Sequence, residues 1–370
     1  MELSIKSLVS IVVPTYKEVE NLPHLIAAVS VAMRSAGLSY EIVVVDDDSQ
    51  DGSEECVKAL QNNHPVRLIS RKTQRGLSSA VLDGFRHARG EFLVCMDADL
   101  SHPPDRIPAL IAKLREPRVD FVIGSRYVDG GSIPKDWGRL RRLNSWAATQ
   151  LARPLTSVQD PMAGFFALRR ETFDKASVSL SPIGYKIGLE LLVKCRCTNV
   201  REVPIDFADR KYGESKLGLR EQVDYLRHLK RLLDFKFGRG SRLLQFCLVG
   251  ATGVVVDLLM FNLLLLVVSL TVARALAVGV AMTSNFWLNR RLTFSYSRGS
   301  DWIRSYIQFV FSCSLGAFVN WIVSVKLISA ASFFRDHVTA AAAIGILCGT
   351  VFNFILSSEW VFSRPARRIH

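Results

Sequence analysis

Two aspartates, Asp97 and Asp99, follow an apolar segment and are separated by one small residue, Ala98. Hard divalent cations such as Mg²⁺ and Mn²⁺ take carboxylate oxygens as ligands, and substrate phosphates and water complete their shells. A cation held there would stabilise a diphosphate leaving group as a Lewis acid. The pair could instead cap the next helix, but a second apolar segment also ends in aspartates, Asp46 to Asp48. The pattern therefore predicts a Mg²⁺ or Mn²⁺ site.

Apolar and helical segments alternate through the first 125 residues and would position these aspartates. Short apolar runs predict strands at residues 9–14, 41–45, 66–70, 91–96 and 120–124. Helices are predicted at about 21–35, from 53 onward, at 77–88 and at 104–114. This alternation predicts a doubly wound, mostly parallel α/β sheet, which binds ligands at the carboxyl ends of its strands. Those ends carry Tyr16, Glu18, Asp46 to Asp48, Asp97, Asp99 and Arg126.

The composition differs between the two parts of the 370-residue chain, because long apolar stretches begin only after about residue 243. The formal net charge of +13 is compatible with binding to nucleic acid, anionic lipid or phosphorylated small molecules. No basic run is interleaved with aromatic residues and no zinc-finger spacing occurs, so nucleic acid is not an expected partner. The seven cysteines include no CxxC pair and are expected to be reduced packing residues.

Four apolar segments are long enough to cross a hydrocarbon core, which needs about 20 residues per helix. They cover about residues 243–268, 272–292, 306–329 and 338–357. Arginines precede the first segment, separate the second from the third and follow the fourth. Because basic loops stay in the cytoplasm, we expect an all-α, four-helix transmembrane domain with the first domain on the cytoplasmic side. The chain is then a multi-pass protein of the cell membrane, or of the ER membrane in a eukaryote.

The apolar region repeats itself. Gly253 and Asn285 of the first pair of segments recur as Gly316 and Asn353 of the second, which predicts a parallel duplication. Asp257 is costly in lipid, about 2.5 to 3.5 kcal/mol at mid-span, so it should face protein or water. Two roles remain open for Asp257: hydrogen bonding to the Asn residues, and contact with a lipid phosphate.

Residues 219–237 link the two regions in an amphipathic pattern, with leucines near one face and Arg and Lys on the rest. A basic helix of this kind lies on an anionic membrane surface, and packing against the first domain is the alternative. We therefore expect three parts: a first domain at 1–218, an interface helix or linker at 219–240 and a transmembrane domain at 241–370.

Ordered motifs in the first domain resemble one known family. They are Pro14-Thr15-Tyr16-Lys17-Glu18, Val45-Asp46-Asp47-Asp48-Ser49, Asp97-Ala98-Asp99-Leu100-Ser101-His102-Pro103-Pro104 and Gly124-Ser125-Arg126-Tyr127. Together they resemble glycosyltransferase family 2 over about residues 8–235. A later run resembles the dolichol-phosphate mannose synthases: Asp209-Arg210-Lys211-Tyr212-Gly213-Glu214-Ser215-Lys216-Leu217. The apolar region resembles GtrA-like domains.

The resemblance implies a GT-A (Rossmann-like) fold and inverting transfer of mannose from GDP-mannose to dolichyl or polyprenyl phosphate. It implies that the nucleotide sugar meets Pro14, Tyr16, Glu18, Val45, Asp47, Asp97, Ala98 and Asp99. It also implies a metal on Asp97 and Asp99, and an acceptor phosphate held by Arg126, Arg210 and Lys216. Asp99 and these three cations form the implied catalytic set. Some members have Gln where this chain has Ser101, which is a weaker metal ligand.

Elementary chemistry agrees with this implication. A phosphate monoester has a second pKa of about 6, so at neutral pH it is mostly a dianion and needs no general base to attack an anomeric carbon. It does need cations that bring two anionic partners together, and Arg and Lys provide them. We therefore expect a single in-line displacement. Asp160, which precedes Gly164-Phe165, has two open roles: an active-site residue or a turn cap.

Other functions remain open at this stage. One is transfer from UDP-glucose to the same kind of lipid, because no single residue proves the base or the sugar. Another is translocation of a lipid-linked sugar, with a first domain that only binds nucleotide. A processive polysaccharide synthase is a third, although the chain lacks a Gln-x-x-Arg-Trp run.

Overall fold

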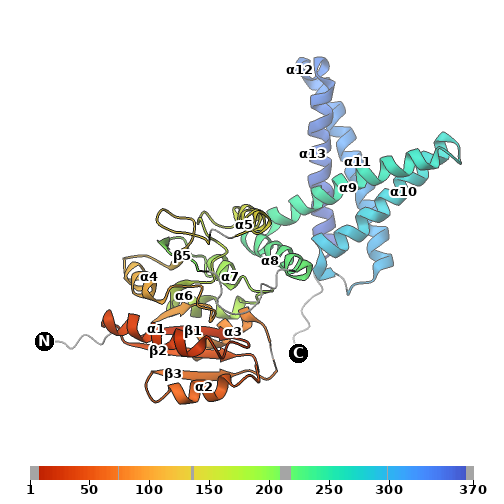
Figure 1. Ribbon diagram of the computed structural model, residues 1–370. Coiled ribbons are helices and arrows are strands. Elements are labelled where there is room, and N and C mark those ends of the chain that lie inside the picture. The colour runs from red at the N-terminus through yellow and green to blue at the C-terminus, as the bar shows by residue number, and fades with distance from the viewer. Residues whose placement is uncertain (1–7, 74, 135–136, 209–217, 298, 364–370) are drawn as a thin grey trace, which may run out of the picture. The chain divides into compact units, whose positions relative to one another are not determined.

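The computed structural model describes residues 8–73, 75–134, 137–208, 218–297 and 299–363. The chain divides into two compact units, Met1–Lys236 and Phe237–His370 (Figure 1). The first unit is a layered α/β domain, and the second is built of long helices.

A mixed seven-stranded sheet forms the centre of the first unit. Its strands are β1 (Val9–Thr15), β2 (Tyr40–Asp46), β3 (Val66–Ser70), β4 (Phe92–Cys95), β5 (Phe121–Ser125), β6 (Phe166–Arg169) and β7 (Val200–Pro204). Their order in the sheet is β3-β2-β1-β4-β6-β5-β7, and β6 runs antiparallel to both of its neighbours. The five predicted strands are confirmed, whereas β6 and β7 were not predicted.

Helices cover both faces of this sheet (Figure 1). They are α1 (Leu22–Ser35), α2 (Ser53–Leu60), α3 (Leu77–His87), α4 (Ile107–Leu114), α5 (Arg139–Ala152), α6 (Arg170–Ala176) and α7 (Ile187–Lys194), with short 3₁₀ turns η1 (Pro104–Arg106) and η2 (Ser177–Ser179). Alternate residues of β1 enter two separate cores: Ile11 packs with α1 and α4, and Val12 packs with α3, α6 and α7. The strands are therefore apolar on both faces, as in other buried sheets.

Helix α8 (Leu219–Phe237) belongs to the first unit up to Lys236. Its buried residues Leu229 and Leu232 pack with Ala152 at the end of α5 and with Leu189 on α7. Of the two interpretations left open for this segment, packing against the first domain is therefore observed. Other apolar side chains of α8 are exposed, among them Val223, Leu226 and Phe235.

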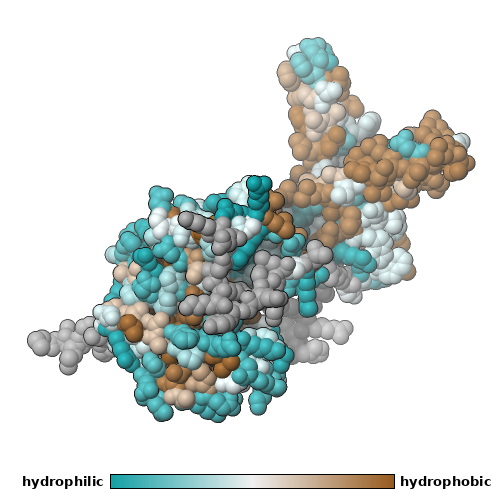
Figure 2. Space-filling view, viewed as in Figure 1, coloured by the Kyte–Doolittle hydropathy of each residue, from teal (hydrophilic) through white to brown (hydrophobic). Residues whose placement is uncertain are grey.

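Four long helices make up most of the second unit: α9 (Arg239–Leu264), α10 (Leu270–Leu288), α11 (Trp302–Ala330) and α13 (Val338–Leu356). Short segments complete it: α12 (Ser332–Asp336), a 3₁₀ turn η4 (Ser295–Ser297), and π-helical turns η3 (Asn289–Thr293) and η5 (Ser357–Val361). Within the described residues, three helices are long and apolar enough to cross a membrane: α9, α11 and the segment Val338–Val361. The 19-residue α10 contains Arg274 and Asn285 and falls outside this group, so the predicted count of four is approximate. Figure 2 shows hydrophobic side chains over these long helices.

The predicted repeat is visible in how these helices pair. Helix α9 packs with α10, and α11 packs with α13. In the first pair a Cβ at Gly253 would overlap the side-chain amide of Asn285, and in the second a Cβ at Gly316 would lie 3.1 Å from Cβ of Asn353. A π-helical turn follows each Asn-bearing helix. Each glycine thus lets an asparagine of the neighbouring helix approach closely.

Asp257 of α9 pairs with an arginine and not with the asparagines. Its Oδ2 lies 2.7 Å from Nη1 of Arg274 on α10, and the guanidinium lies 5.5 Å from the ring of Phe261. An ion pair lowers the cost of placing a carboxylate among apolar helices.

Candidate active site

A cavity of about 980 Å³ opens at the carboxyl ends of β1, β4 and β5. Seven predicted site residues line it: Pro14, Tyr16, Glu18, Asp97, Ala98, Asp99 and Arg126. Helices α5 and α8 and the segment before α7 line the remaining wall. The sheet edge therefore brings together residues that are more than 100 positions apart in the chain.

The carboxylate pair lies directly after β4. Oδ1 of Asp99 accepts hydrogen bonds from the backbone N–H of Ser101, at 3.1 Å, and from its hydroxyl, at 2.6 Å. The hydroxyl of Ser101 thus orients the carboxylate of Asp99. Ser101 is therefore better placed to support a metal ligand than to bind the metal itself. The side chain of Asp97 is 28% exposed, and a Cβ at the facing Gly164 would lie 3.2 Å from its Oδ2.

His102, a residue not singled out from the sequence, supports Asp97. Its Nδ1 accepts a hydrogen bond from the backbone N–H of Asp97 at 3.0 Å, so Nε2 carries the proton and faces Oδ2 of Asp97 at 3.8 Å. Burial lowers the pKa of His102 against the opposing charges of Asp97 and Asp99, which favours the neutral ring. The imidazole stacks on Phe165 with ring centroids 5.3 Å apart.

Two hard oxygen ligands on one cavity wall fit a divalent cation whose other ligands come from phosphate and water. The described residues contain no group of three or more His, Cys, Asp or Glu side chains that could enclose a metal by themselves.

Arg126 is held by Asp160. The fully buried carboxylate accepts from Nε of Arg126 at 2.7 Å, from Nη2 at 2.8 Å and from its backbone N–H at 3.1 Å. Burial lowers the pKa of Arg126, but the hydrogen bonds and charge of Asp160 outweigh this and raise it. Five N–H donors belong to a guanidinium, so donors remain for an anion. Asp160 does not line the cavity itself; its buried side chain supports Arg126, which does.

Lys186 also lines the cavity, although its sequence context does not predict it. It immediately precedes α7, and its Nζ donates to the carbonyl oxygen of Met162 at 3.3 Å. Burial, with the charge of Arg126, lowers the pKa of Lys186 to about 8, against the opposing effect of Asp160 and Asp97. Nothing in the local run Gly184-Tyr185-Lys186 signals this role, because the lysine reaches the site only through the packing of α7.

At the other end of the cavity lie Pro14, Tyr16 and Glu18, while Val45 and Asp47 do not line it. Val45 is buried within β2. The carboxylate of Asp47 accepts from the backbone N–H of Gly76 at 2.6 Å and pairs with Nη1 of Arg71 at 3.1 Å.

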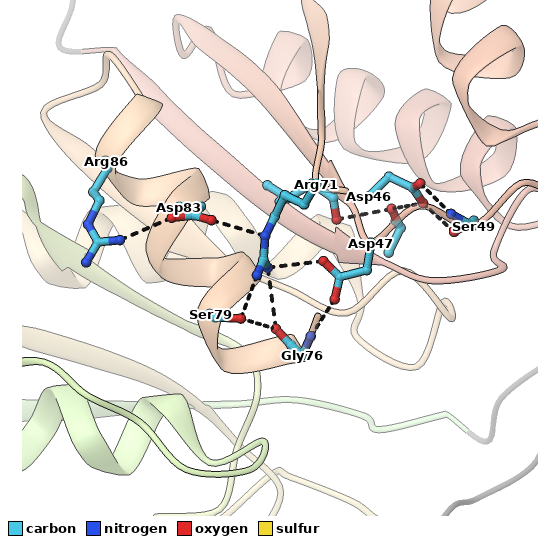
Figure 3. Close-up of polar contacts among 10 residues, drawn as sticks. Asp46, Asp47, Ser49, Arg71, Gly76, Ser79, Asp83 and Arg86 are labelled. Atoms are coloured by element: carbon cyan, nitrogen blue, oxygen red, sulfur yellow. Dashed lines mark hydrogen bonds and ion pairs between the residues drawn. The ribbon is translucent and has the colours of Figure 1, made fainter. Parts of the chain in front are cut away.

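Arg71 connects the loops around Asp47. Figure 3 shows its guanidinium between Asp47, Ser79 and Asp83, with Nη2 2.7 Å from the hydroxyl of Ser79 and Nε 3.1 Å from the carboxylate of Asp83. Gly76, the first residue before α3, belongs to the cavity wall. In this structure Asp47 therefore holds the wall in place.

Arg210 and Lys216, with the rest of the run from 209 to 217, lie outside the described residues. Their contact with an acceptor phosphate remains a prediction.

Comparisons with known proteins agree with this arrangement. Residues 10–176 match the glycosyl transferase family 2 model, and residues 245–362 match that of the GtrA/DPMS transmembrane domain. A dolichol-phosphate mannosyltransferase of Pyrococcus furiosus is 38% identical over 94% of this chain and 97% of that protein. Proteins of the same name from Mycosarcoma maydis and Saccharomyces cerevisiae are 46% and 43% identical, over 80% and 90% of their lengths and 62% and 64% of this chain.

Among solved structures, glucosyl-3-phosphoglycerate synthase from Mycobacterium tuberculosis in complex with phosphoglyceric acid is 21% identical, with a TM-score of 0.48, over 62% of this chain and 80% of that chain. The same enzyme in complex with Mn²⁺, uridine diphosphate and glucosyl-3-phosphoglycerate has a TM-score of 0.47. The archaeal relative, by contrast, matches nearly end to end. The chain therefore belongs to glycosyltransferase family 2, among the dolichol-phosphate mannosyltransferases, with a GtrA/DPMS transmembrane domain in the same polypeptide.

Proposed function

We propose that this protein transfers mannose from GDP-mannose to the phosphate of a dolichyl or other polyprenyl lipid, with inversion at the anomeric carbon. The observation that carries the proposal is one cavity in which the carboxylates Asp97 and Asp99 share walls with the cations of Arg126 and Lys186. The end-to-end relative named dolichol-phosphate mannosyltransferase supports the choice of donor sugar and acceptor.

Asp97 and Asp99 would hold Mg²⁺ or Mn²⁺, which when bound supplies Lewis-acid stabilisation of the departing diphosphate. Arg126, oriented by Asp160, donates hydrogen bonds to the acceptor phosphate, and Lys186 adds a second positive charge nearby. A phosphate oxygen forms the new bond to the anomeric carbon while the bond from that carbon to GDP breaks. The chain's contribution is to hold two anionic partners in line. Arg210 and Lys216 would complete this set of cations.

The acceptor would enter from a lipid surface. Exposed apolar side chains lie on α5 and α8 of the first unit: Leu140, Leu143, Trp146, Leu151, Val223 and Leu226. Two of them, Leu151 and Leu226, also line the cavity, so an apolar face adjoins its opening. Exposed Arg139 and Arg142 accompany this face, and such a basic apolar surface suits an anionic bilayer.

The test is transfer by the purified full-length protein to polyprenyl phosphate, with GDP-mannose and UDP-glucose compared as donors. We expect mannose transfer with Mg²⁺ or Mn²⁺, none after EDTA treatment, and a loss of at least roughly 10²-fold in Asp99→Asn. Asp105→Asn, an exposed carboxylate nearby, serves as the control. If the protein transferred sugar from UDP-glucose and not from GDP-mannose, the proposed donor would be wrong. Full activity in EDTA would show that the reaction needs no divalent metal.

A further inference from the structure

A second buried polar cluster lies outside the groups that face the substrate, at the contact between α7 and α8. Glu190 of α7 and His228 of α8 are each only 1% exposed, and Lys194 of α7 is close to them. Their surroundings are apolar, since Leu189, Val193, Leu229 and Leu232 pack around them. Buried charges in such a place are expensive unless each is paired.

Both carboxylate oxygens of Glu190 have hydrogen-bond partners. Nε2 of His228 lies 2.6 Å from Oε2, while Nζ of Lys194 and the backbone N–H of Ser181 lie 2.6 and 2.8 Å from Oε1. Burial raises the pKa of Glu190, but these hydrogen bonds outweigh it and hold the pKa at about 2. Glu190 is therefore an anion, and His228 donates to it through Nε2–H.

The bond from His228 to Glu190 joins α8 to the domain at a buried position. Other polar contacts of α8 lie nearer the surface. The hydroxyl of Tyr225 donates to the carbonyl oxygen of Ala148 at 2.6 Å, Arg231 donates to Ser181 Oγ at 2.9 Å, and Lys236 donates to the carbonyl oxygens of Pro154 and Leu155 at 3.0 and 2.8 Å. Packed helices can slide past one another by small steps when only apolar side chains join them. A slide of α8 would remove the donor of His228 from Oε2 of Glu190, while Lys194 and Ser181 stay on Oε1, and a buried carboxylate oxygen that loses its donor opposes the movement.

The position of α8 matters for the cavity. Glu221, Gln222, Tyr225 and Leu226 all line it, and all lie within two turns before His228. In the sequence, α8 begins three residues after Lys216, one of the predicted phosphate ligands. The same helix ends where the second unit begins, so it is the covalent link between the cavity wall and the apolar helices.

We propose that Glu190 and His228 are positioning residues that hold α8 in the register at which Tyr225 and Gln222 form the acceptor side of the cavity. This rests on the proposed function, because the side of α8 is taken as the side of the lipid phosphate. Neither residue lines the cavity among the described residues, so the pair acts through α8. The affinity for the nucleotide sugar at the far end of the cavity should then be independent of it.

Three variants of His228 test this in the full-length protein. In His228→Gln, the amide nitrogen reaches about as far as Nε2 and can still donate to Glu190; His228→Asn is one methylene shorter and cannot. His228→Phe keeps a ring and removes the donor. Arg231→Ala is the matched control, because it removes an exposed polar contact from the same helix.

We expect the Asn and Phe variants to raise the KM for polyprenyl phosphate roughly tenfold, with the KM for GDP-mannose unchanged within about twofold. Hydrogen exchange of the α8 amides should be faster in both. The Gln variant and Arg231→Ala should resemble the wild type in both measurements. Comparison of Gln with Asn keeps the test valid if the Phe variant fails to fold.

The two hypotheses fail in different ways. Equal exchange of the α8 amides in the Gln and Asn variants would overturn the positioning role, whatever the enzyme transfers. An equal rise of both KM values would also overturn it, since the effect would then be general. If the wild type transfers no mannose to polyprenyl phosphate while exchange follows the expected order, the proposed function is at fault and α8 is still held by this pair.

Discussion

Arg126 illustrates how a single residue in this site depends on a distant one. Its guanidinium is nearly buried among the rings of Tyr127, Trp137 and Phe207, and this buried charge is paired because Asp160, 34 positions later, binds it through two nitrogens. The carboxylate in turn is fully buried and needs the arginine. Each member of such a pair stabilises the charge of the other, and removal of either leaves an unpaired buried charge.

Asp160→Asn should therefore destabilise the first unit by about 3–5 kcal/mol and also lower transfer. The physical reason is the uncompensated charge of Arg126. Thermal unfolding in detergent, followed by circular dichroism, measures the effect. Asp206→Asn, at an exposed carboxylate that accepts from Ser132, should change little. A midpoint for Asp160→Asn equal to that of the control would contradict the paired-charge explanation.

Lys186 gives the site a pH dependence. Its pKa is lowered to about 8 in the folded protein, so the ammonium is present below that pH and lost above it. If the cation assists an anionic substrate, kcat/KM should fall roughly tenfold per unit well above pH 8. Lys186→Met should lower the rate at neutral pH and abolish this alkaline fall. If Lys186→Met kept both the rate at neutral pH and the alkaline fall of kcat/KM, Lys186 would have no role in the reaction.

At the scale of elements, loops at the ends of strands need their own supports. The wall formed by Gly76 and Leu77 lies where the loop after β3 enters α3, and the guanidinium of Arg71 joins it to Asp47, which follows β2 (Figure 3). A loop carries few apolar contacts, so buried hydrogen bonds decide its position.

Arg71→Met should raise the KM for the nucleotide sugar roughly tenfold, because the wall beside Tyr16 loses its support. The KM for polyprenyl phosphate should change much less. Arg86→Met provides the matched control, since Arg86 contacts the same Asp83 from a half-exposed position. Steady-state kinetics with each substrate varied in turn measures both constants; an unchanged donor KM in Arg71→Met would show that the loop keeps its position without the arginine.

The helix pairs of the second unit depend on close approach of backbones. A Cβ at Gly349 of α13 would lie 2.6 Å from the carbonyl oxygen of Gly316 on α11, and backbone atoms cannot rotate away. Gly349→Ala should thus separate the two helices and destabilise the unit by about 1–3 kcal/mol. Gly279→Ala on α10 is the control, because a Cβ there meets no atom within 4 Å. Thermal unfolding in detergent compares them, and equal midpoints would argue against tight packing of α11 on α13.

For the whole molecule, an α/β unit and a unit of apolar helices in one chain bring a water-soluble donor and a lipid acceptor to the same protein. The arginines at both ends of the apolar region and in its middle predict a cytoplasmic first unit. GDP-mannose is charged and does not cross a bilayer. The membrane face at which added GDP-mannose is consumed is therefore the face that carries the first unit.

Sealed vesicles with the cytoplasmic face outward should therefore transfer mannose from added GDP-mannose, whereas vesicles of the opposite orientation should do so only after permeabilisation. Radiolabelled product lipid measures both. Orientation is checked with a marker enzyme of known sidedness. Full activity in sealed vesicles with the cytoplasmic face inward would reverse the predicted topology.

The sequence by itself determined the features that depend on local pattern. Five strands, the helices between them and the long apolar helices were predictable because a buried parallel strand and a lipid-facing helix are both continuous apolar runs. The cluster of Tyr16, Glu18, Asp97, Asp99 and Arg126 was predictable for a related reason. Parallel strands end at one edge of a sheet, so residues that follow them meet there.

Only the tertiary structure decided the features that rest on contacts between distant residues. Strand β6 has four residues and runs antiparallel, which no periodicity signals. Lys186 enters the cavity, Asp47 turns to Gly76 and Arg71, and Asp257 meets Arg274, each through the packing of another element. The physical reason is that a charged side chain in a low-dielectric interior takes its role from the partner that folding places beside it, and residue type and spacing along the chain do not specify that partner.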